Sequence, residues 1–324
     1  MLAEFKPHLA AFIMLFFALA SSAQAQRTLR VIVPFSAGGP VDLTTRWLMQ
    51  EAQGPLALSI IVENRAGAGG NIGMEALAKA PPDGYTIGIA TTASHALNPW
   101  LFSKLPYKPQ SDFQAITLML KVPNVLVLSM QNSFRLNLNT LSDLIAYAKK
   151  HPGALNYASG GNGSAGHLAA ELLKSMAHLD ITHIPFNGAS PAQLALLSGQ
   201  VDFNIDNLSS AAMGIKTGKL RALAVSSAHR SPLLPMVPTI AETLPGFEIE
   251  TWWGLVAPQG VRSEWVNQLN QVFVNLLKSQ EMKDKFASVM AQPHASTPEQ
   301  FEAMMSAERE KYQHLVSISG ARVD

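Results

Sequence analysis

A short apolar strand, a loop of small residues and the start of a helix follow one another at two places in this chain. This repeated unit limits the fold more than any other feature. The first copy runs from a strand at 31–33 through Ser36-Ala-Gly-Gly39 into a helix from about Pro40, and the second from a strand at 154–158 through 159–166 into a helix from His167. Glycine lets backbone approach a ligand closely, and the first N–H groups of a helix have no partner inside it. Each copy therefore predicts an anion-binding loop.

Apolar strands alternate with helices along the rest of the chain. We expect strands at 58–62, 86–90, 181–185, 201–205, 220–225 and 251–258, and two strands within 112–128 separated by 121–124. This alternation indicates an α/β fold with a mostly parallel sheet. A chain of 324 residues is long enough for two domains. We predict two lobes, 26–125 with 250–324 and 126–249, that face each other across a cleft, because ligands of open α/β sheets bind at the carboxyl ends of strands.

Several helix boundaries follow from capping residues. Ser190 and Pro191 suit the N-cap and first position of a helix that ends near 198. Two helices, 263–278 and 298–315, are expected to finish the chain, and Thr297 is the predicted N-cap of the second.

Residues 1–25 have the pattern of a cleaved secretory signal. Lys6 supplies a positive charge, residues 10–20 form a short apolar run, and Ala23-Gln-Ala25 matches a small-x-small cleavage site. The alternative is a membrane anchor, but the apolar run is short for a bilayer span. We therefore expect a mature chain from about Gln26, exported and not embedded in a membrane.

Composition excludes several kinds of site. The chain has 24 basic and 23 acidic residues and no basic run, so nothing indicates nucleic-acid binding. It has no cysteine, which removes disulfides and thiolate chemistry. None of the standard metal-ligand spacings occurs. We therefore expect neither a cofactor nor a metal.

Two glycine-containing segments come close to catalytic or cofactor motifs. Gly67-Ala-Gly69 lacks the third glycine of a dinucleotide fingerprint, since Ile72 occupies that position. Residues 162–166 resemble a nucleophile elbow around Ser164, with Asn162 in place of the first glycine. An exported serine hydrolase using Ser164 is therefore the alternative function, although Ser164 also suits a helix N-cap.

Other polar and aromatic residues have a structural interpretation beside a functional one. Asp42 lies in the first turn of the helix from Pro40, where a carboxylate complements the helix dipole and stabilises by about 0.3–1 kcal/mol. His95 and His167 are expected to orient loops or line the cleft. Trp252 and Trp253 suit core or hinge packing, with Trp252 as the one that could border the cleft.

The same segments carry a specific family resemblance. The motifs are Pro34-Phe-Ser-Ala-Gly-Gly39 with Asp42 and Arg46, Val62-Glu-Asn-Arg65 with the glycines at 67–73, Ser159-x-x-Asn-Gly-Ser-x-x-His-Leu-Ala169, Gly218-Lys-Leu-Arg-Ala-Leu-Ala224 and Trp253-Gly-Leu-Val-Ala-Pro258. In this order they resemble the Bug-type receptors, the extracytoplasmic solute-binding subunits of tripartite tricarboxylate transporters. The resemblance extends over nearly the whole mature chain.

The resemblance implies a type II periplasmic-binding fold of the Venus-flytrap kind, with two hinged lobes and no catalysis. It also implies a periplasmic monomer that binds a small carboxylate, mainly through backbone amides, and docks on inner-membrane transporter subunits. The ligand-binding positions that it implies are Phe35, Ser36, Ala37, Gly38, Gly39, Asp42, Ala68, Gly69, Gly70, Thr91, Ser94, His95, Ser159, Asn162, Gly163, Ser164, His167, Asn187, Gly188 and Asp206.

Two departures from the family pattern affect the expected ligand. Ser36 stands where the family often has proline, which adds a hydroxyl and an N–H near the anion. Phe186-Asn187-Gly188 stands where it often has Tyr-Lys-Gly, so one cation is absent. The second departure favours a mono- or dicarboxylate over a tricarboxylate.

Overall fold

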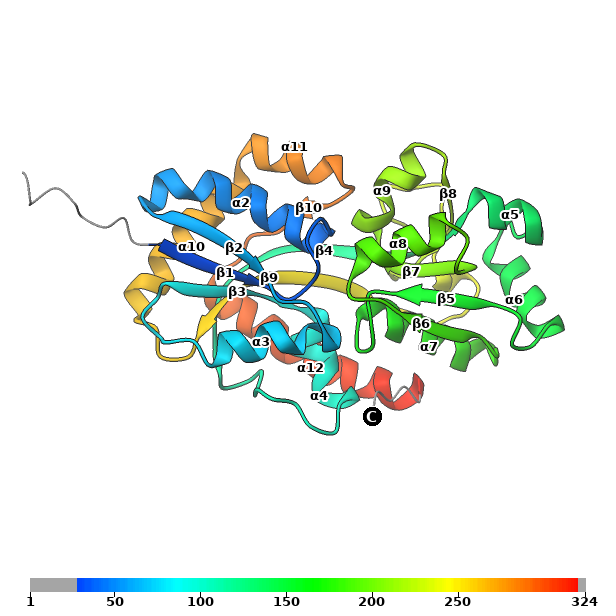
Figure 1. The fold of residues 1–324 in the computed structure, drawn as a ribbon, viewed down its shortest axis with the longest axis horizontal. Coiled ribbons are helices and arrows are strands. Elements are labelled where there is room, and N and C mark those ends of the chain that lie inside the picture. Colours follow the sequence, from blue (N-terminus) through cyan, green and yellow to red (C-terminus); the bar gives the residue numbers. More distant parts are fainter. Residues whose placement is uncertain (1–27, 320–324) are drawn as a thin grey trace, which may run out of the picture.

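The strands of both halves of the molecule belong to one hydrogen-bonded sheet (Figure 1). The computed structural model describes residues 28–319. Its strands are β1 (Thr28–Val33), β2 (Ser59–Asn64), β3 (Thr86–Thr91), β4 (Phe113–Ser129), β5 (Asn156–Ser159), β6 (Thr182–Pro185), β7 (Phe203–Asn207), β8 (Leu220–Val225), β9 (Glu250–Pro258) and β10 (Gln292–Pro293). They follow the order β2-β1-β3-β9-β4-β7-β5-β6, and β8 and β10 also pair with β4. Pairing is parallel among β1, β2 and β3 and among β5, β6 and β7.

Helices cover both faces of this sheet (Figure 1). They are α2 (Pro40–Leu56), α3 (Asn71–Ala78), α4 (Asn98–Leu101), α5 (Met130–Leu136), α6 (Leu141–Lys150), α7 (Ala165–Ala177), α8 (Ala189–Leu197), α9 (Leu208–Lys216), α10 (Ser263–Lys278), α11 (Gln280–Ser288) and α12 (Pro298–Ser319), with short helical turns at Ala68–Gly70, Ala93–Leu97 and Ile240–Glu242. None of the helices within 28–319 is long and apolar enough to cross a membrane. The predicted signal sequence lies outside the described residues.

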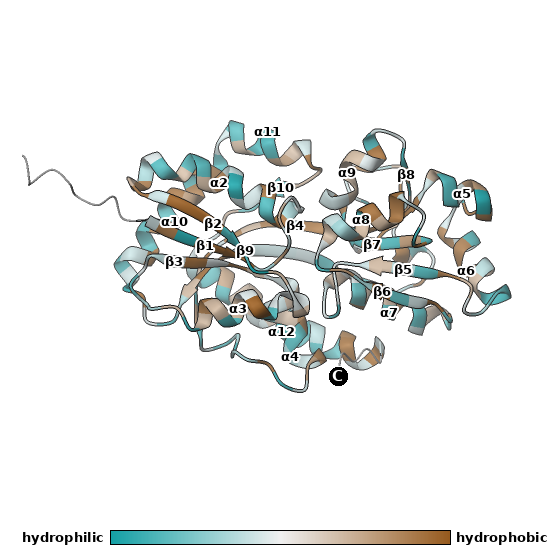
Figure 2. Cartoon of the chain, in the orientation of Figure 1, coloured by the Kyte–Doolittle hydropathy of each residue, from teal (hydrophilic) through white to brown (hydrophobic). Residues whose placement is uncertain are grey.

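The apolar core consists of two clusters that each extend through both lobes. One joins α3 and α12 to α7, through Met74, Phe301 and Leu168. The other joins α2 and α10 to α8, through Leu48, Leu269 and Ala195. Strands β2 and β3 between these layers are mainly hydrophobic (Figure 2). Each lobe is thus a three-layer α/β/α structure, as the alternation of strands and helices predicted. The prediction of a mostly parallel sheet is wrong, because β4 pairs antiparallel with β7, β8, β9 and β10, and β9 pairs antiparallel with β3.

Two long strands, β4 and β9, connect the lobes. Residues 113–123 of β4 pair with β9, and residues 124–129 pair with β7 and β8 of the other lobe. The prediction of two strands broken at 121–124 is therefore wrong. Proline cannot donate a ladder hydrogen bond, but Pro123 is the last residue paired with β9. The strand exchanges partners there and does not end.

Helices α8 and α11 and strand β10 also differ from the sequence prediction. Helix α8 begins at Ala189 with Gly188, and not Ser190, as its N-cap. Helix α11 was not predicted, because it is polar and buries only Met282 and Phe286, which gives a weak periodic signal. Strand β10 is only two residues long and pairs with β4. The predicted cap at Thr297 is confirmed, since its hydroxyl accepts a hydrogen bond from the Gln300 N–H.

Candidate functional site

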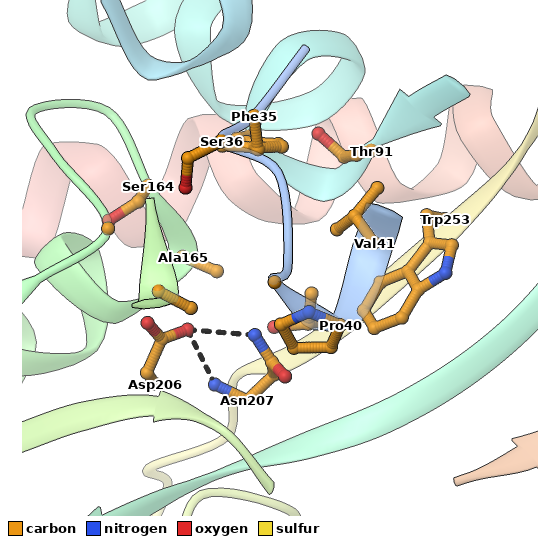
Figure 3. A pocket seen from close by; sticks show the side chains of 15 residues that line it. Phe35, Ser36, Pro40, Val41, Thr91, Ser164, Ala165, Asp206, Asn207 and Trp253 are labelled. Carbon is orange, nitrogen blue, oxygen red and sulfur yellow. Dashed lines mark hydrogen bonds between the residues drawn. The ribbon is translucent and has the colours of Figure 1, made fainter. Parts of the chain in front are cut away.

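Two adjoining cavities lie where the loops of the two lobes meet, and Figure 3 shows the first of them. The first is lined by Phe35, Ser36, Gly39, Pro40, Val41, Thr91, Ala93, Gly160, Ser164, Ala165, Ala189, Asp206, Asn207, Thr251 and Trp253. The second is lined by Phe35, Gly67, Ala68, Gly69, Gly70, Gly160, Gly161, Asn162, Pro185, Phe186 and Asn187. Because Phe35 and Gly160 line both, the cavities form two compartments of one site.

The free space suits a small ligand. The centre of a water molecule can move through about 50 Å³ of the first cavity and about 240 Å³ of the second. A single water needs roughly 10–15 Å³ on this measure. The first compartment therefore has room for a few heavy atoms, and the second for the remainder of a small molecule.

Loop 1, residues 34–39 between β1 and α2, is held in shape by Asp42. The Asp42 carboxylate accepts hydrogen bonds from the Gly38 N–H at 2.9 Å, from Arg46 Nε at 2.9 Å and from Asn64 Nδ2 at 2.8 Å. Asn64 Nδ2 also donates to the Phe35 carbonyl at 3.0 Å. Burial alone raises the pKa of the Asp42 carboxyl, but these hydrogen bonds outweigh it and hold the pKa below its ordinary value. Asp42 is thus an ionised support of the loop.

Loop 2, residues 160–164 between β5 and α7, is held by hydroxyls and imidazoles. Ser164 Oγ accepts a hydrogen bond from the His167 N–H at 3.2 Å, which confirms the predicted N-cap. His167 Nδ1 in turn accepts the Gly163 N–H at 3.3 Å. Ser159 Oγ accepts the Gly161 N–H at 3.1 Å and lies 2.7 Å from His183 Nε2.

These contacts bear on the serine hydrolase alternative. A serine nucleophile is activated by a base whose ring nitrogen lies within hydrogen-bond reach of its Oγ. In the structure the Ser164 hydroxyl is bonded to backbone, and the ring of His167 is bonded to Gly163. Ser164 and His167 therefore form no nucleophile–base pair here.

The two lobes touch each other through glycines. A Cβ on Gly69 of lobe 1 would lie 2.5 Å from the Asn162 carbonyl oxygen of lobe 2. A Cβ on Gly188 of lobe 2 would collide with Ser36 Oγ of lobe 1. The residue at each position has a positive φ, of 61° and 122°, which also favours glycine. The structure is therefore closed around the two cavities.

The structure brings many of the predicted residues to the cavities and places others behind them. Phe35, Ser36, Gly39, Thr91, Ser164 and Asp206 line the first cavity, and Phe35, Ala68, Gly69, Gly70, Asn162 and Asn187 line the second. The remaining predicted residues do not line either cavity: Ala37, Gly38, Asp42, Ser94, His95, Ser159, Gly163, His167 and Gly188. Most of these make the hydrogen bonds or close contacts that shape the lining.

Sequence reasoning missed part of the lining. Some missed residues adjoin predicted ones, such as Pro40 and Val41 after loop 1 and Asn207 after Asp206. Thr251 and Trp253 come from the apolar strand β9 and gave no signal of a site. Trp252, expected as the residue that could border the cleft, does not line it. Successive strand residues point to opposite faces, so Trp253 faces the cavity while Trp252 Nε1 donates to Glu308 on α12.

Asp206 is the one ionisable side chain among the described residues that line the site, and burial raises its pKa to about 6. Within the described part of the chain, no Lys, Arg or His lines either cavity. Burial lowers the pKa of His95 to about 3, and burial together with the charge of His167 lowers the pKa of His183 to about 3, so both imidazoles are neutral near pH 7. Among residues 28–319 no group of three or more His, Asp or Glu could hold a metal ion. An anion in this site would be held by N–H and O–H donors.

Comparison with known proteins agrees with this geometry. The family described as tripartite tricarboxylate transporter family receptor matches residues 44–320. Protein BugT of Bordetella pertussis is 35% identical over 92% of this chain and 90% of its own length. A structure of R. palustris Rpa4515 with adipate is 33% identical, covers 93% of this chain and 100% of its own, and has a TM-score of 0.87. MatC of Rhodopseudomonas palustris with bound malate is 32% identical, covers 90% and 99%, and has a TM-score of 0.84.

The fold, its two lobes and the expected Bug-type resemblance are thereby confirmed. The matched region extends through both lobes and both connecting strands, and a structure of the periplasmic binding protein BugD, 31% identical, also matches with a TM-score of 0.86. The chain belongs to the tripartite tricarboxylate transporter family of receptors.

Proposed function

We propose that this protein is a periplasmic receptor that captures a small carboxylate between its lobes and delivers it to the membrane subunits of a tripartite tricarboxylate transporter. One observation carries the proposal. Glycine loops from two lobes close around a shared cavity whose described lining offers amide and hydroxyl donors and no cationic side chain. The adipate and malate in the structures of Rpa4515 and MatC support carboxylates as the ligand class.

The connecting strands supply the hinge of this receptor. We place the lobe boundaries near residues 125 and 250, where β4 and β9 pass from one lobe to the other. Thr251 Oγ1 donates to Asn124 Oδ1 at 2.8 Å, which links the two strands at the crossing. A few residues at the ends of elements can absorb the backbone rotation of domain closure. The open form of the protein would expose both cavities.

The donors of the site explain how it would hold an anion without a salt bridge. Amides near a helix N-terminus and aligned hydroxyls favour negative charge. Loop 1 precedes α2 and loop 2 precedes α7, so both helices direct their N-termini toward the site. Most of the predicted ligand-binding residues act either as lining or as supports of these loops.

The lining limits the negative charge of the ligand, because the described residues contribute the Asp206 carboxylate and no Lys, Arg or His to it. Asn187 lines the second cavity where the family often has lysine. We therefore expect mono- and dicarboxylates to bind more tightly than citrate. Tighter binding of citrate than of any simpler acid would contradict this expectation.

Calorimetric titration of small carboxylates, with a thermal-shift screen beforehand, tests the receptor function. A ligand at 100 times its Kd stabilises the folded state by about 2.7 kcal/mol. We expect such stabilisation without turnover, and we expect it to weaken in Gly70→Val. Gly70 has a φ of 98°, and its Cβ would lie 3.5 Å from the Phe35 ring. Ester hydrolysis that disappears in Ser164→Ala would instead support the hydrolase.

A further inference from the structure

Asp206, at the end of β7, brings a carboxylate into a cavity that none of the described cationic side chains lines. The residue is 8% exposed. Its Oδ1 accepts two hydrogen bonds from Asn207, from the backbone N–H at 2.7 Å and from Nδ2 at 2.9 Å. Both run to the same oxygen, as the dashed lines in Figure 3 show.

The other oxygen, Oδ2, is buried and has no hydrogen-bond partner among residues 28–319. A Cβ on Gly160 would lie 3.7 Å from it, and Gly160 lines both cavities. Oδ2 therefore lies next to the place where the compartments join. Leaving a buried polar atom unpaired costs free energy, and a charged one costs more.

Ser36 of lobe 1 brings a potential hydrogen-bond donor to the same site. Its hydroxyl lines the first cavity, is buried and likewise has no hydrogen-bond partner in the described part of the chain. A hydroxyl donates to an anion, whereas a carboxylate only accepts. The closed site thus has an unpaired potential donor on one lobe and an unpaired acceptor on the other.

We infer that the ligand is a carboxylic acid with an N–H or O–H donor next to its carboxylate, and that Asp206 Oδ2 selects this donor. This inference rests on the proposed function, since it takes the site to be the carboxylate site. A 2-amino or 2-hydroxy acid places a carboxylate oxygen and a donor on neighbouring carbons, so one ligand could pair with Ser36 and Asp206 together. An ammonium is the better partner, because no Lys, Arg or His within 28–319 lines either cavity to neutralise Asp206.

Matched series of acids test this assignment. Each series keeps one carbon skeleton and varies the substituent at C2 among hydrogen, hydroxyl and ammonium. The probes are succinate, malate and aspartate; glutarate, 2-hydroxyglutarate and glutamate; and 3-phenylpropionate, phenyllactate and phenylalanine. In any series that binds, we expect the ammonium or hydroxyl acid to have a Kd at least tenfold lower than the unsubstituted acid.

A variant pair tests the residue. Asp206→Asn retains an oxygen for Asn207 and places an amide donor where Oδ2 stands, so the tenfold preference should vanish or reverse. Asp202→Asn is the matched control. Asp202 lies just before the same strand, but its carboxylate binds Arg135 Nη2 at 2.7 Å and the Asn156 N–H at 3.0 Å, away from both cavities. This control should lower the melting temperature and leave the preference unchanged.

The outcomes separate the inference from the function on which it rests. If the unsubstituted acid binds the wild-type protein as tightly as its substituted partners, the inference is wrong and the receptor function stands. The inference is equally wrong if a folded Asp206→Asn protein keeps the wild-type preference. If none of the nine acids binds, the inference falls together with the proposed function. The wild-type series is decisive even if Asp206→Asn does not fold.

Discussion

Loop 1 is held by charged side chains, whereas loop 2 is held by hydroxyls and neutral imidazoles. Asp42, Arg46 and Asn64 fix the first through hydrogen bonds of 2.8–2.9 Å. Around the second, His167 and His183 stack with their ring centroids 4.4 Å apart. The same order of strand, small-residue loop and helix is thus stabilised in two chemically different ways. The two loops should therefore respond differently to mutation and to pH.

Removing the Asp42 carboxylate that supports loop 1 should give the largest loss of stability. In Asp42→Ala, the Gly38 N–H, Arg46 and Asn64 lose a common acceptor. Breaking a buried charged network costs about 3 kcal/mol. Chemical denaturation of the wild type and the variant measures the difference, and carboxylate affinity should fall as well.

Asp143→Ala is the control for this variant. Asp143 accepts the N–H groups of Asn139 and Thr140 near the start of α6, but it does so on the surface. Its loss should cost about 1 kcal/mol, in the range of capping interactions. Equal costs for the two variants would show that the Asp42 network is no stronger than an ordinary cap.

Protonation of His183 in mild acid should weaken the packing beside loop 2, whereas the Asp42 network of loop 1 should be spared. The pKa of His183 is about 3 in the folded protein and 6.5 ordinarily, so its contribution to stability is complete above pH 6.5 and declines as the pH falls toward 3. Linkage gives a loss of about 2 kcal/mol at pH 5. The stabilisation that comes from the lowered pKa of the Asp42 carboxyl has a different pH window, since it is lost only as the pH falls below about 3.8.

The measurement is the free energy of unfolding between pH 7 and pH 4.5 for the wild type and His183→Gln. The variant should show a shallower decline in this range. His183 also stacks on Tyr157 at 4.7 Å, so the variant will be less stable at every pH, and only the slope is diagnostic. Identical slopes would mean that His183 is not the group that takes up the proton.

The contact between loop 1 and lobe 2 can be tested through Gly188. In Gly188→Ala the new methyl group would collide with Ser36 Oγ, and the φ of 122° would be strained. The closed state should become less populated, and the affinity for a carboxylate should fall about tenfold, which corresponds to about 1.4 kcal/mol.

Gly199→Ala is the matched control, because it follows the same helix, α8, and has a positive φ of 77°. Nothing lies within 4 Å of its Cβ position. This variant should lose some stability and keep its affinity. Equal affinity losses in the two variants would assign the effect to backbone strain and not to lobe closure.

The sequence predicted the architecture well because strands and capped helices leave local signals. Loop 1, loop 2 and the positions of β1, β3 and β8 all follow from periodicity and small residues within a few positions. The continuity of β4 through Pro123 could not be predicted, since it depends on partners that are distant in sequence. For the same reason Trp253 of β9 looked like core, and the unpaired Oδ2 of Asp206 became visible only in the folded structure.

The smallest expected effect concerns the cap of loop 2. In Ser164→Ala the His167 N–H loses its acceptor at the start of α7, and such losses cost about 1 kcal/mol. Stability should therefore fall by about a third of the loss in Asp42→Ala. Because Ser164 also lines the first cavity, affinity should fall at the same time.

Ser164→Thr separates the two roles, since it restores the cap but adds a methyl group to the lining. If the Ser164→Thr protein regains stability while its Kd stays high, the hydroxyl supports the loop and the cavity has no room for the methyl. If both recover, the effect of Ser164 on binding passes entirely through the cap.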